Sequence, residues 1–160
     1  MSDDLRLAAL LRGSGKTLGL AESCTGGLVA ARITSLAGSS AYFSGGVVAY
    51  ANQVKQGLLG VPELLLLQFG AVSEEVARAM AEGARQALGC DVALSVTGIA
   101  GPDGGTTAKP VGTVYIGLAD GAQCQVRQYR FGGGREDVRS ETVETALNWL
   151  QNYLESAKNS

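Results

Sequence analysis

The spacing of apolar residues along the chain predicts helices and strands in alternation. Apolar residues three or four positions apart mark helices that bury one face. Short segments that are apolar, or that alternate with polar residues, mark strands. Helices are expected at residues 3–12, 28–37, 52–59, 63–69, 74–88 and from 135 to about 154. Strands are expected at residues 16–21, 42–50, 91–97, 111–119 and 123–131.

The order of these elements indicates an α/β fold with three layers, α/β/α. Strands that alternate with helices pair in parallel, whereas Asp120-Gly121 between the last two strands is a hairpin signal. The central sheet is therefore predicted to be mixed and mainly parallel, in a single domain that covers residues 1–160. Glycine-rich segments 22–27 and 98–105 follow two of the strands, so both loops should leave the edge of the sheet where α/β proteins bind ligands.

Composition limits the cellular compartment in which the protein is expected and the partners it is expected to bind. No apolar run approaches the roughly 20 residues that a membrane span needs, and the acidic N-terminus is unlike a signal peptide, which predicts a cytoplasmic protein without a membrane partner. The formal charge is −2 and the basic residues are scattered, so no nucleic-acid partner is expected. Cys24, Cys90 and Cys124 have no metal-binding spacing, which indicates reduced thiols and no metal site.

The chain contains 23 glycines and no histidine. Without histidine, the Ser-His-Asp and Cys-His systems and the zinc sites that use histidine are excluded. Lysine, tyrosine and the carboxylates are the main bases that remain. Lys55 and Tyr50 flank a predicted helix start, and elimination makes Lys55 the leading base, although a single lysine is more often a solvated surface residue.

The segment Glu22-Ser-Cys-Thr-Gly-Gly27 lies at a strand-to-helix turn. Helix amides and the hydroxyls of Ser23 and Thr25 could bind an anion there, or could simply cap the helix. Cys24 would be an alternative nucleophile, because a helix N-terminus lowers the pKa of a thiol.

Two further segments could complete a site. The loop after Thr97 is glycine-rich enough to approach a ligand, or could be an ordinary solvated loop. Arg135 begins the last helix and could bind a second anion, or pair with Glu136 or Asp137. Arg139 is interpreted as structural.

Several motifs in this order resemble one known family. They are ESCTGG, GSSAYFSGGVVAYANQVK, GAVSEEVARAMAEGAR, SVTGIAGPDGG, KPVGTVY and FGGGRxxVR, and they extend from about Gly19 to Leu154. The chain is similar to the C-terminal domain of the CinA competence/damage-inducible proteins. The N-terminal nucleotide-processing domain of full-length members is not part of this sequence, so its activity is not expected.

The resemblance implies hydrolysis of the carboxamide of nicotinamide mononucleotide, which gives nicotinic acid mononucleotide and ammonia in pyridine nucleotide recycling. It implies no metal or other cofactor, and a homo-oligomer, usually a dimer. Leu64 to Leu67 is more apolar than expected and is interpreted as facing a partner subunit. The implied catalytic residues are Ser23, Ser40, Tyr50 and Lys55, and the substrate-binding residues are Thr25, Gly26, Gly27, Thr97, Gly98, Gly101 and Arg135.

Several alternatives stay open at this point. The main hypothesis is a serine activated by Lys55, with Tyr50 passing protons or orienting groups. Ser23 or Ser40 would attack, depending on which loop holds the phosphate; Cys24 and a water activated by lysine are the other nucleophiles. A different class of protein, a nucleotide-binding and oligomerising module without catalysis, could use the same pocket.

Overall fold

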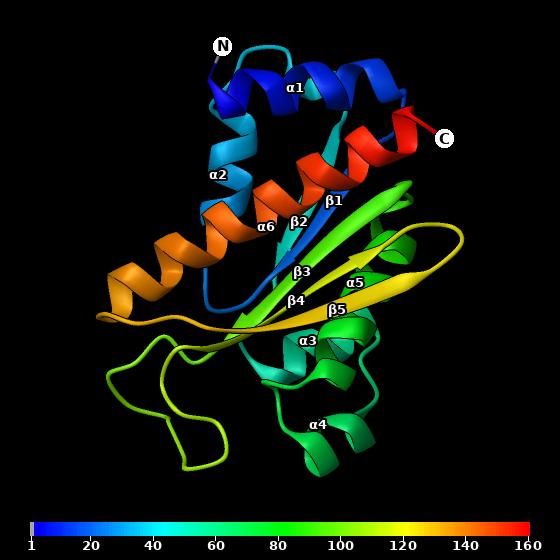
Figure 1. Ribbon diagram of the computed structural model, residues 1–160. Coiled ribbons are helices and arrows are strands. Elements are labelled where there is room, and N and C mark those ends of the chain that lie inside the picture. The colour runs from blue at the N-terminus through cyan, green and yellow to red at the C-terminus, as the bar shows by residue number, and fades with distance from the viewer. Residues whose placement is uncertain (1) are drawn as a thin grey trace.

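The computed structural model describes residues 2–160, and Figure 1 shows a sheet between two layers of helices. The elements are α1 (Asp3–Ser14), β1 (Leu18–Glu22), α2 (Leu28–Thr34), a 3₁₀ turn η1 (Ser39–Ala41), β2 (Phe43–Val48), α3 (Asn52–Leu59), α4 (Glu63–Phe69), α5 (Glu74–Leu88), β3 (Val92–Gly98), β4 (Thr113–Ala119), β5 (Cys124–Arg130) and α6 (Arg135–Lys158). The predicted helices and strands are confirmed within a few residues. Helix α2 ends earlier than predicted, because the Thr34 and Ser35 hydroxyls donate to carbonyls of its last turn.

The strands lie in the order β2-β1-β3-β4-β5. Strand β1 is parallel to β2 and β3, and β4 is antiparallel to β3 and β5. Of these strands, β4 alone therefore runs in the opposite direction, and the predicted mixed α/β sheet is confirmed. Because β1, β2, β3 and β5 end at the same edge, that edge receives both glycine-rich loops, the start of α3 and the start of α6 (Figure 1).

Side-chain alternation divides the core into two parts. Leu20 and Leu94 point from the sheet toward α1, α2 and α6, where they join the larger apolar cluster. Ala21 and Ala93 point the other way, toward α3, α4 and α5. Small residues on this second face allow α5 to approach closely, since a Cβ on Gly117 would lie 3.0 Å from a carbonyl oxygen of α5.

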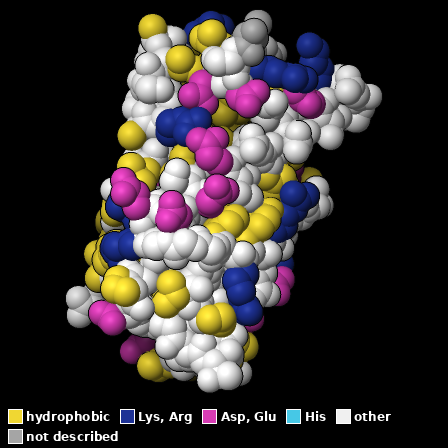
Figure 2. Space-filling view, turned by 60° about the vertical axis from the view of Figure 1, so that its left-hand side comes forward, with side chains coloured by type: hydrophobic (Ala, Val, Ile, Leu, Met, Phe, Trp, Pro, Cys, Tyr) yellow, Lys and Arg dark blue, Asp and Glu magenta, His cyan; other side chains and the backbone are white. Residues whose placement is uncertain are grey.

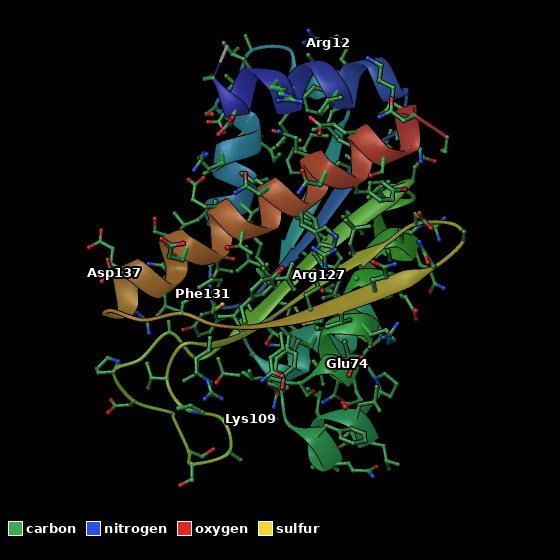
Figure 3. All side chains as sticks on the ribbon, in the orientation of Figure 1. Arg12, Glu74, Lys109, Arg127, Phe131 and Asp137 are labelled. Carbon is green, nitrogen blue, oxygen red and sulfur yellow. The ribbon has the colours of Figure 1, made fainter. Side chains whose placement is uncertain are left out.

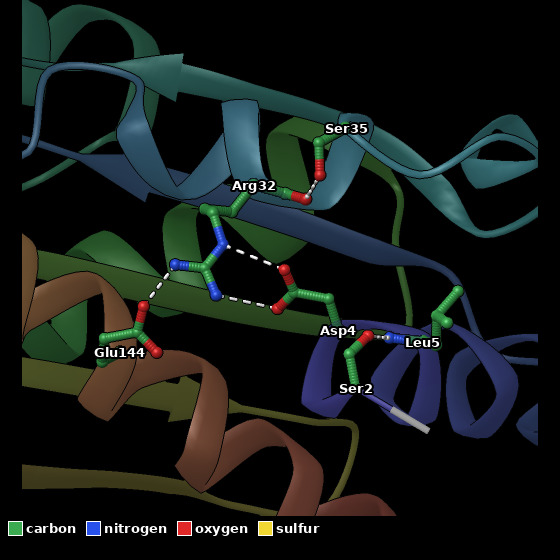
Figure 4. Close-up of polar contacts among 6 residues, drawn as sticks. All are labelled: Ser2, Asp4, Leu5, Arg32, Ser35 and Glu144. Atoms are coloured by element: carbon green, nitrogen blue, oxygen red, sulfur yellow. Dashed lines mark hydrogen bonds and ion pairs between the residues drawn. The ribbon is translucent and has the colours of Figure 1, made fainter.

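Polar contacts join the helices of the first layer. Arg32 of α2 donates through Nε and Nη2 to the two carboxylate oxygens of Asp4 in α1, at 3.3 and 2.8 Å. The same guanidinium pairs with Glu144 of α6 (Figure 4). Partly exposed pairs of this kind contribute modestly to stability, so their main effect is to align the three helices.

The surface carries charges of both signs. Figure 2 shows Lys and Arg side chains interspersed with Asp and Glu on the face that it presents. Among the helices of residues 2–160, none combines the length and apolar character needed to span a membrane. On α4, Leu64 and Leu67 are 69% and 76% exposed, and their contact with a partner subunit in a homo-oligomer stays a prediction.

The contact between α5 and α3 requires a glycine. A Cβ added to Gly83 would collide with the carbonyl oxygen of Leu59, whereas Gly57 in α3 has open space around it. We expect Gly83→Ala to lower the free energy of unfolding by about 1–3 kcal/mol through overpacking. The matched variant Gly57→Ala should be neutral or should stabilise by up to about 1 kcal/mol. Urea denaturation followed by circular dichroism checks both, and equal effects of the two variants would contradict the close approach.

Candidate active site

The end of β1 directs two adjacent residues to opposite faces of the sheet. Glu22 is in phase with Leu18 and Leu20 and lies on the side of α2. Ser23 follows on the side of α3, where it is 8% exposed and its Oγ lies 3.1 Å from Lys55 Nζ. The alternation of a strand therefore sends the serine toward the lysine and the carboxylate away from it.

Lys55 is buried at 1% exposure in the inward face of α3. Its Nζ lies 2.8 Å from the carbonyl oxygen of Ala49 and 3.0 Å from that of Tyr50, in addition to the serine hydroxyl. Burial lowers the pKa of Lys55 below its ordinary value of 10.5, and the neighbouring Cys24 opposes this only in part. Among residues 2–160 no carboxylate forms an ion pair with Lys55, so no carboxylate offsets the cost of burying its charge.

Ser23 and Lys55 face a cavity of about 200 Å³ at the carboxyl edge of the sheet. Its walls come from the turn after β1, the start of α3, the segment between α4 and α5, the end of β3 and the start of α6. The lining residues are Ser23, Cys24, Tyr50, Lys55, Ala71, Val72, Thr97, Gly98, Ala100 and Arg135. Six of the residues predicted for the site (Ser23, Tyr50, Lys55, Thr97, Gly98 and Arg135) are thus brought together.

Glu22 occupies the N-terminus of α2. Its Oε1 accepts hydrogen bonds from Thr25 Oγ1 at 2.6 Å, Gly27 N at 3.2 Å and Val29 N at 2.9 Å, and its Oε2 accepts from Ala30 N at 3.0 Å. The carboxylate is 2% exposed. The sequence predicts an anion site at this helix N-terminus, and the anion that occupies it is the carboxylate of Glu22.

This arrangement changes the interpretation of the predicted phosphate cradle. Thr25 is fully buried and its hydroxyl points to Glu22, and Gly27 N donates to the same carboxylate. Gly26 N donates to the carbonyl of Ser23. The structure does not bring these three residues to the cavity lining. Sequence reasoning missed Glu22 as the cap; an acidic residue at the end of a strand before a helix was the available signal.

Ser40 lies apart from this cavity. It is exposed in η1, before β2, whereas Ser23 follows β1, and the two strands are parallel. Ser40 is therefore at the amino end of the strands and Ser23 at the carboxyl end. The structure does not bring Ser40 together with Lys55.

Tyr50 and Arg135 form the mouth of the cavity. The Tyr50 side chain is 60% exposed, and its hydroxyl accepts a hydrogen bond from Arg135 Nη2 at 3.3 Å. Arg135 Nη1 donates to the carbonyl of Gly101 at 2.8 Å. The main chain of Tyr50, rather than its hydroxyl, is what contacts Lys55. Asp137, which could have paired with Arg135, accepts instead from Gly134 N at 2.9 Å.

The far wall is built from the end of β3. The Thr97 hydroxyl donates to the carbonyl of Ala71 at 2.9 Å, which fixes the segment after α4. At Gly98 an added Cβ would lie 2.7 Å from Val114 Cγ2 and 3.2 Å from Cys24 Sγ, so only glycine fits. Burial raises the pKa of Cys24 to about 11, and the sequence-based expectation of a lowered thiol pKa is wrong because desolvation outweighs the helix terminus.

Lys109 is a structural contributor that sequence reasoning missed. It comes from the loop between β3 and β4, beside α4, as Figure 3 shows. Its Nζ donates to the carbonyls of Phe69 and Val72. This joins the long loop to the segment that supplies Ala71 and Val72 to the cavity.

The residues described offer no metal centre: residues 2–160 bring no three His, Cys, Asp or Glu side chains into a group that could hold an ion. The chemistry that the cavity offers comes from a hydroxyl, a buried amine and backbone groups. Fold and site together define an α/β protein with a buried serine–lysine pair at the carboxyl edge of its sheet.

The chain belongs to the CinA C-terminal domain family, whose model matches residues 3–154. It is 64% identical over 155 residues to a CinA-like protein of Geobacter sp. (strain M21) and 61% identical over 154 residues to one of Geobacter sulfurreducens. These alignments cover 97% and 96% of this chain and 37% of each relative. The chain thus spans a little over a third of the length of these curated relatives.

Solved structures agree with this membership. A CinA superfamily protein from Klebsiella pneumoniae is 33% identical with a TM-score of 0.92, covering 98% of this chain and 99% of that one. The competence/damage inducible protein CihA from Agrobacterium tumefaciens is 40% identical with a TM-score of 0.89, covering 97% of each chain.

The lowered pKa of Lys55 predicts a pH-dependent contribution to stability. Between the folded pKa and the ordinary value of 10.5, the unfolded state binds more protons at Lys55 than the folded state does. The free energy of unfolding therefore rises with pH in that window. Lys55→Met removes this contribution, so the stability of the wild type relative to the variant should increase as the pH is raised toward 10.5.

Urea denaturation of both proteins across this pH range measures the difference. Lys158→Met, at the exposed end of α6, is the control for loss of a lysine. A wild-type advantage that stays constant or shrinks with pH would contradict the depressed pKa.

Proposed function

We propose that this domain hydrolyses the carboxamide of nicotinamide mononucleotide, releasing ammonia and nicotinic acid mononucleotide. The observation that carries the proposal is the 3.1 Å contact between Ser23 Oγ and the buried Lys55 Nζ at the wall of a cavity. A serine activated by lysine is an established nucleophile that needs no histidine. Family membership supports the class of protein, and the resemblance to the family supports the substrate.

The hydrogen bonds of Lys55 suit a general base. A neutral amine has two N–H donors and one lone pair. The carbonyls of Ala49 and Tyr50 lie 2.8 and 3.0 Å from Nζ and can accept these two N–H bonds. In the proposed reactive state the lone pair is then the group of Nζ that faces the hydroxyl of Ser23, 3.1 Å away. The two backbone carbonyls therefore orient the amine as well as satisfying it.

The proposed reaction has two stages. Lys55 takes the hydroxyl proton of Ser23 while Oγ attacks the carboxamide carbon, and a tetrahedral intermediate forms. The C–N bond then breaks, Lys55 returns the proton to the leaving nitrogen, and ammonia departs from a Ser23 ester. Water, deprotonated by Lys55, attacks this ester and Lys55 returns its proton to Ser23 as the acyl–oxygen bond breaks. The carboxylic acid formed then loses its proton to solvent to give the carboxylate.

Backbone groups are proposed to stabilise the oxyanion. The N–H of Ser23 donates to the carbonyl of Val96 at 3.0 Å, so it is already occupied. Cys24 and Gly98 line the cavity, and their N–H groups are the proposed donors. The absence of a side chain at Gly98 is what lets the end of β3 approach Cys24 so closely.

The size of the cavity suggests how the substrate lies. At about 200 Å³ it is smaller than the roughly 300–1,000 Å³ of sites that enclose a whole drug-sized ligand. The pyridine carboxamide would fill it, and the ribose phosphate would extend to the mouth. Arg135 is then the proposed phosphate contact, because Glu22 already occupies the N-terminus of α2.

Two alternatives are less well supported. A pure nucleotide-binding module would gain nothing from burying Lys55, since an exposed cation attracts a phosphate at a lower desolvation cost. A cysteine amidase that uses Cys24 would need a thiolate. Burial raises the pKa of the Cys24 thiol to about 11, which keeps it protonated at neutral pH.

Ammonia release from nicotinamide mononucleotide tests the proposal. We expect Ser23→Ala and Lys55→Met each to lower kcat by a factor of about 10³ or more, as removal of a nucleophile or its base does. Ser40→Ala should leave kcat unchanged, because Ser40 is exposed at the other end of β2. Cys24→Ala should retain most of its turnover.

Two results would count against this mechanism. If the wild-type protein at high concentration releases no ammonia above the blank, the amidase proposal is contradicted. Near-full turnover of Ser23→Ala, together with loss in Ser40→Ala or Cys24→Ala, would transfer the role of nucleophile to another residue.

Arg135 is expected to bind the phosphate of the substrate. Removing a charge-assisted hydrogen bond typically loses binding by a factor of about 10–100, so Arg135→Ala should raise KM for nicotinamide mononucleotide by that factor. KM for nicotinamide riboside, which lacks the phosphate, should change by less than about threefold. Arg130→Ala, on the exposed side of β5, is the matched control. An equal rise in KM for both substrates would show that Arg135 does not bind the phosphate.

A further inference from the structure

Arg139 contacts the turn that carries Ser23 although it does not line the cavity. It lies on α6 one helical turn after Arg135 and is half-buried. Its Nε donates to the carbonyl of Cys24 at 3.1 Å and its Nη2 donates to the carbonyl of Thr25 at 3.3 Å. The mechanism above gives this guanidinium no role.

The contact continues through one peptide group to Ser23. The carbonyl of Thr25 that binds Arg139 shares a planar peptide with the N–H of Gly26. That N–H donates to the carbonyl of Ser23 at 3.0 Å. Because the peptide is rigid and trans, holding its oxygen on Arg139 holds its N–H toward Ser23, and the two bonds polarise each other.

Glu22 holds the same turn through its carboxylate. The carboxylate accepts from the hydroxyl of Thr25 and from Gly27 N, while Arg139 donates to the carbonyl of Thr25. Gly26 and Gly27 have φ angles of +57° and +108°, and Leu28 N and Ala31 N at the start of α2 donate to the carbonyls of Thr25 and Gly27 at 3.0 and 2.9 Å. The carboxylate of Glu22 and the guanidinium of Arg139 therefore add side-chain contacts to the backbone hydrogen bonds that shape this turn.

We propose that Arg139 is a positioning residue for the nucleophile. It holds the Ser23–Gly27 turn so that Ser23 Oγ stays within reach of Lys55 Nζ, and it touches neither substrate nor reacting atoms. This inference rests on the proposed function of Ser23. Small displacements of a reacting group reduce rates by as much as 10²-fold, so loss of Arg139 acts on kcat rather than on substrate affinity.

Steady-state kinetics with nicotinamide mononucleotide separate positioning from binding. Arg139→Gln is expected to lower kcat by a factor of about 10–100 with KM within about threefold of the wild type. Arg139→Lys, which can reach one of the two carbonyls, should fall between. In Arg139→Ala, methylguanidinium in the buffer should restore a measurable part of kcat. A raised KM with unchanged kcat in Arg139→Gln would overturn the proposal.

The matched control is Arg78 of α5. It also donates from a helix to a backbone carbonyl, that of Cys124, away from the cavity. Arg78→Gln removes a comparable contact and should leave kcat unchanged. Thermal unfolding of both variants shows whether they are folded to the same extent. Equal losses of kcat in Arg78→Gln and Arg139→Gln would overturn the proposal, since the effect would then be one of general stability.

A second measurement does not depend on the substrate. The rate at which phenylmethanesulfonyl fluoride sulfonylates Ser23, followed by mass spectrometry, should fall in Arg139→Gln by about the same factor as kcat. If the wild type releases no ammonia, the proposed function fails, and the labelling rates still decide the role of Arg139. An Arg139→Gln protein that is labelled as fast as the wild type would overturn the proposal.

Discussion

Burial of the Lys55 side chain is the constraint on which the carboxyl edge of the sheet depends. An amine in this position needs acceptors and cannot easily keep its charge. The chain meets this with two consecutive carbonyls, from Ala49 and Tyr50, just before α3 begins. The third contact goes to Ser23, so the same geometry that tolerates the lysine aligns it with a hydroxyl.

The charges around this pair are separated by the sheet itself. Glu22 and Ser23 are neighbours in the chain, but the alternation of β1 places the carboxylate under α2 and the hydroxyl beside α3. A carboxylate on the side of α3 would pair with Lys55 and keep it protonated. Instead Glu22 stabilises the N-terminus of α2, and the guanidinium of Arg139 donates to two backbone carbonyls of the same turn.

Helix α6 connects the parts of the site that come from distant segments. Arg135 contacts Gly101 and Tyr50, and Arg139 contacts the turn after β1. Both arginines lie in the first two turns of a helix whose later residues pack into the larger core. In the longer CinA-like relatives, of which this chain spans 37%, the same domain is accompanied by further sequence.

Much of the fold follows from the sequence alone. Apolar spacing and the Asp120-Gly121 turn are local signals, and they determined the helices, the strands and the mixed sheet. The absence of histidine, also readable from the sequence, made Lys55 the candidate base. Only the tertiary structure separated Ser23 from Ser40, because the two residues differ in which end of the parallel strands they occupy. It also decided that Glu22 fills the anion position at α2 and that burial keeps the Cys24 thiol protonated. Those outcomes depend on three-dimensional neighbours and on desolvation, which no local pattern encodes.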